Sequence, residues 1–338
     1  MALLEVRDLR VTLQTSRGAH DALRGVSFDL DHGHTLGLIG ESGCGKSITA
    51  LALMGLLPDG ARVAGSIRFN GRELTTLDEP ALCALRGHRI GMVFQEPMTA
   101  LNPLHTVGRQ IAEPLRLHKG LSRSAARAEA LRLLQRVQLP QARERLDAYP
   151  HQLSGGQRQR VVIAIALACG PDLLIADEPT TALDVTIQRE VLDLVQELVR
   201  EEGQREGRRG MALLLISHDL GVMADTVQRL LVMYGGTVAE SGPTAAVFER
   251  LAHPYTRGLF AARPRLGLRR SDSDAQAGRR GARLPTIPGR VPSLADMPPG
   301  CPFADRCERV VDACRAAPPP PVAVGPMHEA RCLRVYPA

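Results

Sequence analysis

Aromatic residues are scarce in this chain of 338 residues. It contains no tryptophan, and its six phenylalanines and four tyrosines make up only 3% of the sequence. Proteins that bind single-stranded nucleic acid stack the bases on aromatic rings placed among basic residues, and no such interleaving occurs here. The net charge of +6 therefore does not by itself predict a nucleic-acid partner.

Long apolar runs are also missing. A membrane-spanning helix needs about 20 mainly apolar residues, whereas the longest candidates, 48–57 and 161–168, are much shorter. The first ten residues carry both acidic and basic side chains, unlike the start of a secretory signal peptide. We therefore expect the chain to remain in the cytosol.

Lysine is the third rarity, because only Lys46 and Lys119 occur among the 42 basic residues. A lysine at position 46 therefore indicates a site where a compact ammonium serves better than a planar guanidinium. The basic surplus is concentrated in residues 261–292, whose content of proline, glycine and serine predicts a solvated linker. The arginines of this linker region are Arg263, Arg265, Arg269, Arg270, Arg279, Arg280, Arg283 and Arg290.

Apolar residues, by contrast, make up 44% of the chain, enough for a sizeable core. Short apolar runs that indicate buried strands alternate with helical patterns, and this alternation predicts an α/β fold with a parallel sheet. Strands dominate residues 1–40, and a helical insertion is expected over 101–138. The other expected elements are strands at 173–176 and 212–216, helices at 46–57, 154–168 and 185–200, and a hairpin at 229–241.

A glycine-rich segment follows the apolar strand at 35–39 and fits the phosphate-binding pattern G-x-x-x-x-G-K-[ST]. Its glycines let successive backbone N–H groups point at phosphate oxygens, and the following helix N-terminus adds positive potential. Lys46 is expected to neutralise phosphate charge and Ser47 to bind Mg²⁺, and modification of the Cys44 thiol should block ATP. The predicted ATP-binding residues here are Gly40, Glu41, Ser42, Gly43, Cys44, Gly45, Lys46 and Ser47.

Two adjacent carboxylates, Asp177 and Glu178, end the apolar strand at 173–176. Ligand sites of parallel α/β sheets lie at the carboxyl ends of the strands. We expect Asp177 to hold Mg²⁺, directly or through water, and Glu178 to polarise the water that attacks the γ-phosphate.

A third segment, Ser154-Gly155-Gly156-Gln157, is a flexible turn before a helix. It resembles the signature loop of ATP-binding-cassette (ABC) ATPases, and the other motifs of that family follow in the family's order. The resemblance covers residues 1 to about 260. It implies a RecA-like P-loop NTPase cassette with an antiparallel β-subdomain and a helical subdomain at about 96–158. The further matching residues are Gln95 in the Q-loop, Asp184 in the D-loop and the switch histidine His218.

The resemblance also implies roles for these residues. Two cassettes sandwich two ATP molecules, so that the phosphate loop of one faces Ser154, Gly155, Gly156 and Gln157 of its partner. Glu178, His218 and Gln95 form the catalytic group, Gln95 also senses Mg²⁺, and Asp184 acts across the dimer. Many cassettes stack adenine on an aromatic residue near position 17. This chain has Arg17 and His20 there, and Arg17 is the predicted replacement.

The C-terminal region resembles the extension of dipeptide and oligopeptide importer ATPases, most closely the D-type dipeptide group. The resemblance rests on the segments His253–Arg257, Ile287–Pro292 and Gly300–Cys307. It implies a peripheral subunit at the cytoplasmic face of the bacterial inner membrane. Its partners would be a second, homologous ATPase, two permease subunits and an extracytoplasmic peptide-binding protein. The alternatives are import of another substrate such as nickel and a soluble role on nucleic acid.

Four of the seven cysteines lie within residues 293–338, the expected Cys-rich extension. Clustered cysteines in a cytosolic protein argue against disulfides, and the spacing lacks the C-x₂-C pair common in zinc sites. Four thiolates can ligate a [4Fe–4S] cluster, and some dipeptide-permease ATPases carry one at matching cysteines. Zinc and free thiols remain alternatives. His328 is an alternative ligand, but we expect it at the surface. The four residues are Cys301, Cys307, Cys314 and Cys332.

Overall fold

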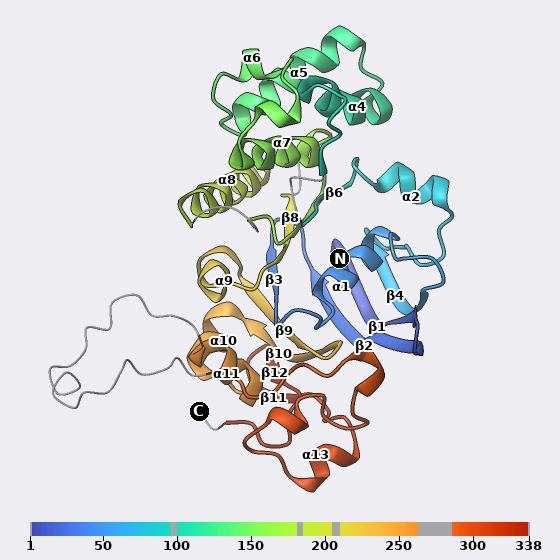
Figure 1. Ribbon diagram of the computed structural model, residues 1–338, viewed down its shortest axis with the longest axis vertical. Coiled ribbons are helices and arrows are strands. Elements are labelled where there is room, and N and C mark those ends of the chain that lie inside the picture. The colour runs from blue at the N-terminus through green and yellow to red at the C-terminus, as the bar shows by residue number, and fades with distance from the viewer. Residues whose placement is uncertain (1, 96–99, 181–184, 205–209, 263–285, 337–338) are drawn as a thin grey trace, which may run out of the picture.

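The computed structural model describes residues 2–95, 100–180, 185–204, 210–262 and 286–336. Figure 1 shows its arrangement, with a helical region at one end and the C-terminal residues at the other. Asp184 and residues 263–285 of the predicted linker lie outside the described residues. None of the described helices combines the length and the apolar character that crossing a bilayer demands.

A four-stranded antiparallel sheet is built mainly from the N-terminal region, in the order β2-β1-β4-β5. Asn70 and Gly71 join the last two strands with φ angles of 50° and 77°, as a two-residue hairpin turn requires. The strands are β1 (Leu4–Thr15), β2 (Gly18–Leu30), β4 (Arg62–Phe69) and β5 (Arg72–Glu73).

A second sheet of eight strands forms the centre of the molecule, in the order β11-β12-β10-β9-β3-β8-β7-β6. The strands from β9 to β6 run parallel, as predicted. They are β3 (Thr35–Ile39), β6 (Ile90–Val93), β7 (Leu173–Asp177), β8 (Ala212–Ile216) and β9 (Arg229–Tyr234), beside the antiparallel β10 (Thr237–Pro243).

Both faces of the parallel strands β3, β6, β7 and β8 are buried, which explains why these strands are continuous apolar runs. In β8, Leu213 and Leu215 belong to the core under the helices, whereas Leu214 and Ile216 belong to the core shared with the N-terminal sheet. The side-chain alternation of a strand therefore places one core on each face. Packing on both faces therefore holds β8, and the loop that follows it, in place.

Helices cover the sheet and form the helical end of the molecule in Figure 1. Ser122 and Ser154 cap α5 and α7 by accepting hydrogen bonds from backbone N–H groups, and Gly55 ends α1 in the left-handed conformation. The helices are α1 (Lys46–Met54), α2 (Glu79–Leu85), α4 (Val107–Lys119), α5 (Arg123–Arg136), α6 (Ala142–Arg145), α7 (Gly155–Leu167), α8 (Val185–Gln204), α9 (Leu220–Thr226), α10 (Thr244–Arg250) and α11 (Pro254–Ala261).

The C-terminal residues extend the central sheet. In β12, Ala330 pairs antiparallel with Glu240 of β10, and β11 pairs with β12. The extension therefore shares a sheet with the cassette core. Its elements are the 3₁₀ turns η2 (Leu294–Asp296) and η3 (Ala304–Arg306), the helix α13 (Asp312–Ala316), β11 (Val322–Gly325) and β12 (His328–Ala330).

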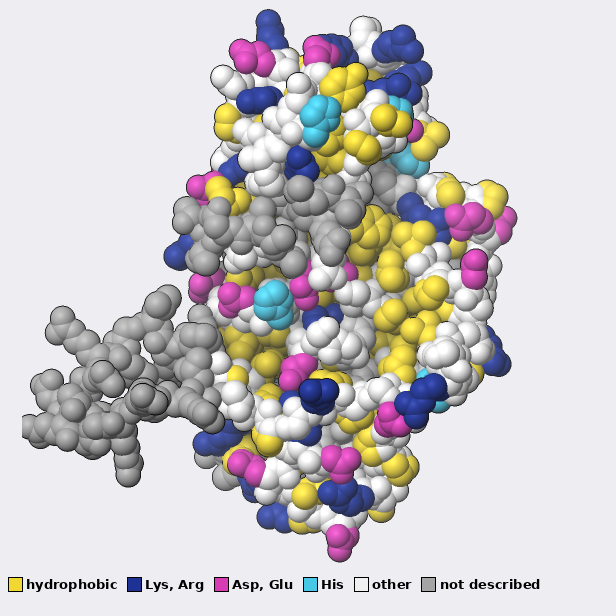
Figure 2. Space-filling model, in the orientation of Figure 1, with side chains coloured by type: hydrophobic (Ala, Val, Ile, Leu, Met, Phe, Trp, Pro, Cys, Tyr) yellow, Lys and Arg dark blue, Asp and Glu magenta, His cyan; other side chains and the backbone are white. Residues whose placement is uncertain are grey.

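Acidic and basic side chains are interspersed over the described residues on the face shown in Figure 2. No stripe of a single sign runs across this part of the described surface. A mixture of both signs is typical of a solvated protein surface.

Candidate nucleotide-binding site

The carboxyl ends of four parallel strands bring the predicted residues to one edge of the central sheet. The phosphate loop follows β3, Gln95 follows β6, Asp177 ends β7, and His218 follows β8. This edge is where a parallel sheet binds ligands, because the loops that leave its strands converge there.

Two glycines shape the phosphate loop. Gly45 caps α1 with a φ angle of 105°, and a Cβ atom there would lie 2.7 Å from the Leu23 side chain. Gly43 has a φ angle of 80°, and a Cβ atom there would have open space around it. Glycine at these two positions therefore lets the loop adopt left-handed backbone angles without a steric penalty, directly before a helix N-terminus that favours an anion.

Lys46 is buried within this loop. Its ammonium donates hydrogen bonds to the carbonyl oxygens of Gly40 at 2.8 Å and Glu41 at 3.2 Å. Cys44 is fully buried, and burial raises the pKa of its thiol more than Lys46 lowers it. Because the thiolate is the reactive form, modification of Cys44 is expected to be slow unless the loop opens.

Asp177 has the surroundings of a cation ligand. Its side chain is buried, and its Oδ1 atom lacks a hydrogen-bond partner among the described residues. Burial raises the pKa of this carboxyl, while a hydrogen bond from Ser47 and the charge of Lys46 lower it and Glu178 raises it further. A buried oxygen without a partner is costly, and Ser47 with Asp177 supplies the hard oxygen ligands that Mg²⁺ prefers. The residues present therefore fit this ion.

Glu178 lies between the two other predicted catalytic residues. The Gln95 Nε2 atom donates to its Oε2 at 3.3 Å, and His218 Nδ1 lies 3.4 Å from the same oxygen. The Glu178 backbone has a φ angle of 46°, an uncommon conformation for glutamate, and its N–H donates to Ile216 at 2.9 Å. Strain of this kind is found at functional sites. The structure thus brings the side chains of Gln95 and His218 to the carboxylate of Glu178.

The signature loop lies on a different part of the chain. Ser154 caps α7, and the Gln157 side chain completes a reciprocal capping box. Gly156 is needed for packing, since a Cβ atom there would lie 2.7 Å from Ile187 of α8. Figure 1 places α7 with the helical region and α1 beside the N-terminal sheet.

Comparison with known proteins gives the family. Residues 23–181 match the family described as ABC transporter, and residues 239–314 match the oligopeptide/dipeptide transporter C-terminal region. A putative peptide import ATP-binding protein of Brucella melitensis is 49% identical over 98% of this chain and 97% of that protein. The oligopeptide transport ATP-binding protein OppD of Salmonella typhimurium is 50% identical over 94% of this chain and 89% of that protein.

The chain belongs to the ABC transporter family. It is an ATPase of that family and has its P-loop cassette fold, as the sequence motifs predict. Among solved structures, a dimeric ATP-binding cassette in a post-hydrolysis state, bound to ADP and Pi, superposes with a TM-score of 0.63. That protein is 28% identical, and the match covers 71% of this chain and 98% of the other.

Arg17 is held by the C-terminal extension of the cassette. Its two terminal nitrogens donate to both carboxylate oxygens of Asp296, at 3.1 and 3.0 Å. His20 lies 3.1 Å from the Arg17 carbonyl. Contact of Arg17 with adenine stays a prediction, but the arginine is oriented by a residue that lies 279 positions away.

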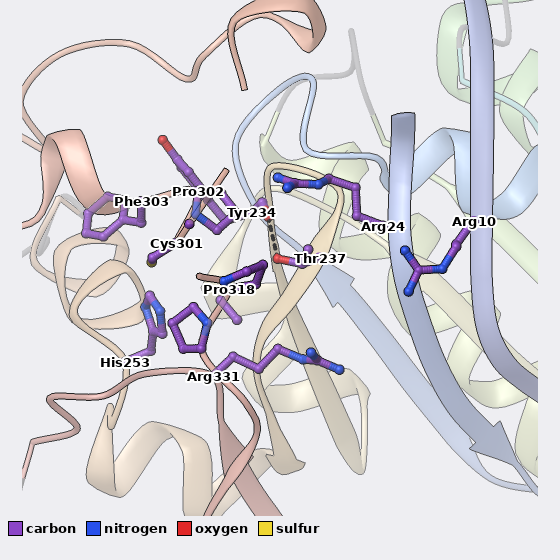
Figure 3. Close-up of a pocket in the computed structure, with 13 residues that line it drawn as sticks. Arg10, Arg24, Tyr234, Thr237, His253, Cys301, Pro302, Phe303, Pro318 and Arg331 are labelled. Atoms are coloured by element: carbon purple, nitrogen blue, oxygen red, sulfur yellow. Dashed lines mark hydrogen bonds between the residues drawn. The ribbon is translucent and has the colours of Figure 1, made fainter. Parts of the chain in front are cut away.

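The four C-terminal cysteines line one small cavity of about 10 Å³. Burial raises the pKa of Cys301 to about 11. A backbone hydrogen bond from Phe303 opposes this rise, and the neighbouring thiols add to it. Phe303 lines the cavity, and Figure 3 shows it beside Cys301 and Pro302. Among the described residues, no group of three or more histidines, cysteines and carboxylates is placed to hold a metal ion.

His328 is buried rather than exposed, so its prediction as a surface residue is wrong. Its Nε2 atom lies 2.8 Å from Oε1 of Glu240, and neither side chain is more than 2% exposed. The histidine is buried because β12 joins the central sheet beside β10. It packs against the cassette strand β10 and does not line the cysteine cavity.

The sequence motifs do not reveal the residues that support the phosphate loop from behind. Arg306 of the extension forms an ion pair with Glu41, and the Tyr255 hydroxyl accepts a hydrogen bond from the Glu41 N–H at 2.8 Å. Tyr234 packs against both Tyr255 and Phe303. The one available signal was a glutamate inside an anion-binding loop, which needs a cationic partner.

Proposed function

We propose that this ATPase drives the import of dipeptides or oligopeptides through a membrane permease. The observation that carries the proposal is the match of residues 239–314 to the oligopeptide/dipeptide transporter C-terminal region. This region follows a cassette that matches the ABC transporter family and gathers the predicted ATP-binding residues at one edge of its central sheet. The named roles of relatives at about 50% identity, peptide import and oligopeptide transport, support it.

Each residue of the edge has a role in ATP hydrolysis. The backbone N–H groups of residues 40–47 and the Lys46 ammonium bind the phosphates, while Ser47 and Asp177 hold Mg²⁺, which neutralises phosphate charge when bound. Glu178 accepts a hydrogen bond from the attacking water. Gln95 and His218 orient Glu178 from either side, as their contacts with its Oε2 suggest.

A partner cassette is required because the signature loop lies away from its own phosphate loop. We infer that Ser154, Gly155, Gly156 and Gln157 act on ATP bound to the second subunit, and that Asp184 contributes across the same interface. The second subunit is proposed to be a homologous ATPase. Two permease subunits and an extracytoplasmic peptide-binding protein complete the importer, with this chain peripheral at the cytoplasmic face.

Reconstitution tests this function. The full chain, its second ATPase and the permease subunits are placed in proteoliposomes with the binding protein, and ATP-dependent uptake of a labelled tripeptide is measured. Uptake that is lost in the Lys46→Ala variant supports the proposal. Uptake of Ni²⁺ but not of peptide, or an ATPase that never associates with the permease, would overturn it.

We further propose that the four cysteines of this cavity hold a [4Fe–4S] cluster, for which the cavity of about 10 Å³, room for roughly one water molecule, must widen. Four cysteines are the donor set of such clusters, and the cavity lining contains Arg309 and Arg334 but no carboxylate, which favours four thiolates. Zinc fits less well, because one ion needs its sulfurs about 2.3 Å from a common point and no group of described residues is so placed.

Metal analysis of protein purified without oxygen tests the cluster. About four irons and four sulfides per chain, lost in a Cys301→Ser/Cys307→Ser variant, are expected. Stoichiometric zinc without iron would make the cavity a structural zinc site. Absence of both metals would leave the thiols as packing groups, and the transport proposal would stand unchanged.

A further inference from the structure

Glu41 places a carboxylate in the loop that must bind the phosphates of ATP. Its side chain is 29% exposed, and its own carbonyl oxygen accepts a hydrogen bond from Lys46 at 3.2 Å. An uncompensated negative charge here would repel the incoming nucleotide through a partly desolvated medium, in which charges interact more strongly than in water.

Arg306 of the extension neutralises this carboxylate. Its Nη1 and Nη2 atoms donate to the two carboxylate oxygens of Glu41 at 2.6 and 3.0 Å, in the bidentate geometry that guanidinium and carboxylate favour. The arginine side chain is only 5% exposed, so water screens the pair little.

The remaining donors of Arg306 are also occupied. Nε donates to the Pro288 carbonyl at 2.7 Å, Nη1 to the Tyr234 hydroxyl at 3.1 Å, and Nη2 to the Ile287 carbonyl at 3.5 Å. The guanidinium therefore has a partner for each of its donor directions and is fixed in orientation. Such a rigid fork holds Glu41, and with it the first turn of the phosphate loop, against the extension.

We propose that Arg306 is a positioning residue for nucleotide binding, which masks the Glu41 charge and fixes the phosphate loop from behind. The extension is then part of the nucleotide site of its own cassette. The loop binds phosphate well only when the extension is folded against it. The relevant ligand is a nucleoside di- or triphosphate, and peptide transport is not needed for the effect.

The test measures equilibrium binding of a fluorescent ADP analogue, with Mg²⁺, to the purified full chain, so that neither hydrolysis nor transport enters the readout. Arg306→Met should weaken binding about tenfold, because it unmasks a negative charge beside the phosphates. Arg315→Met is the matched control. Arg315 lies in the same extension and pairs with Asp305 at the surface, and its loss should leave affinity unchanged.

A second variant separates charge masking from simple support. In Arg306→Met/Glu41→Gln the unmasked charge is gone, and affinity should return to within about threefold of wild type. High salt should narrow the gap between wild type and Arg306→Met. Thermal unfolding without nucleotide is measured in parallel. Wild-type affinity in Arg306→Met, or a double variant as weak as the single one, would overturn the proposal.

Discussion

Glu178 shows at the residue scale how the backbone prepares a side chain for chemistry. The residue adopts a left-handed φ of 46°, and Gln95 and His218 both approach its Oε2 atom. A carboxylate aimed by its own backbone and by two neighbours loses little freedom when substrate binds, which is the preorganisation that catalysis needs.

The Glu178→Gln variant should bind ATP with Mg²⁺ as the wild type does but hydrolyse it about 100-fold more slowly or worse. The amide keeps the shape of the side chain but cannot accept a proton from water. Phosphate release under saturating ATP measures the rate, and Glu129→Gln on α5 is a control whose carboxylate pairs with Arg132 at the surface. Hydrolysis at the wild-type rate would remove Glu178 from the catalytic role, and closed ATP-bound dimers are expected to accumulate in this variant.

His253 makes the stability of the protein depend on pH. It is buried, its Nδ1 atom accepts a hydrogen bond from the Tyr255 N–H, and burial lowers its pKa to about 4. An unfolded histidine titrates near pH 6.5, so between pH 6.5 and 4 the unfolded chain binds more protons and stability falls as pH falls. From pH 7 to pH 5 the loss should be about 2 kcal/mol.

Urea unfolding at pH 7 and pH 5 measures this loss. His253→Asn keeps an acceptor at the start of α11 but does not titrate, so the variant should lose less stability than the wild type over the same interval. Glu73, whose pKa is lowered to about 2, titrates below this window. An equal loss in both proteins would assign the pH dependence to other groups.

At the scale of elements, Glu240 joins the extension to the cassette. Its Oε1 atom accepts hydrogen bonds from the Ala252 N–H at 2.9 Å and lies 2.8 Å from His328 Nε2. Its Oε2 atom accepts from the His253 N–H at 2.9 Å. One buried carboxylate thus connects β10, the start of α11 and β12.

Glu240→Gln should lower the free energy of unfolding by about 1–3 kcal/mol, because an amide NH₂ must then face a backbone donor. Chemical denaturation at pH 7 measures the change. Glu329→Gln is the control, since Glu329 is exposed on β12 and pairs with Ser241 across the same strands. Equal effects of the two substitutions would show that β12 does not depend on this network.

The strands that carry the nucleotide site could be predicted from the sequence, because a strand buried on both faces is a continuous apolar run. This pattern predicts strands at residues 35–39, 173–176 and 212–216, and the structure confirms all three. The strands β11 and β12 could not be predicted. They are four and three residues long, and β12 begins with histidine and glutamate. Their pairing depends on a buried partner, Glu240, that is distant in the sequence.

The residues of the site likewise fall into those that the sequence predicts and those that it does not. Motifs of adjacent residues, such as the phosphate loop and the Asp177–Glu178 pair, show their chemistry locally through spacing. The ion pair of Glu41 with Arg306 spans 265 positions, and no local pattern contains both residues. Contacts of this kind come from the packing of the whole chain, and they link the phosphate loop to the C-terminal residues.

At the scale of the whole molecule, the cysteine cavity lies behind the phosphate loop. Arg306 ends the turn η3 and directly precedes Cys307, while the Cys301 N–H donates to the Cys314 carbonyl at 2.7 Å. Phe303, which directly precedes this turn, packs against Tyr234 and Tyr255. A change at the cysteines should therefore reach Glu41 through Arg306.

The Cys301→Ser/Cys307→Ser variant should weaken binding of the fluorescent ADP analogue severalfold, in the same direction as Arg306→Met. Cys83→Ser, on the exposed face of α2, should not. In the Arg306→Met background the cysteine substitutions should weaken ADP binding little further, because the side chain that connects the cysteine segment with Glu41 is already absent. Additive losses in the triple variant would mean that the cavity influences the loop by another route. Unchanged affinity in the cysteine variant would mean that the thiols, with or without metal, serve only the fold of the extension.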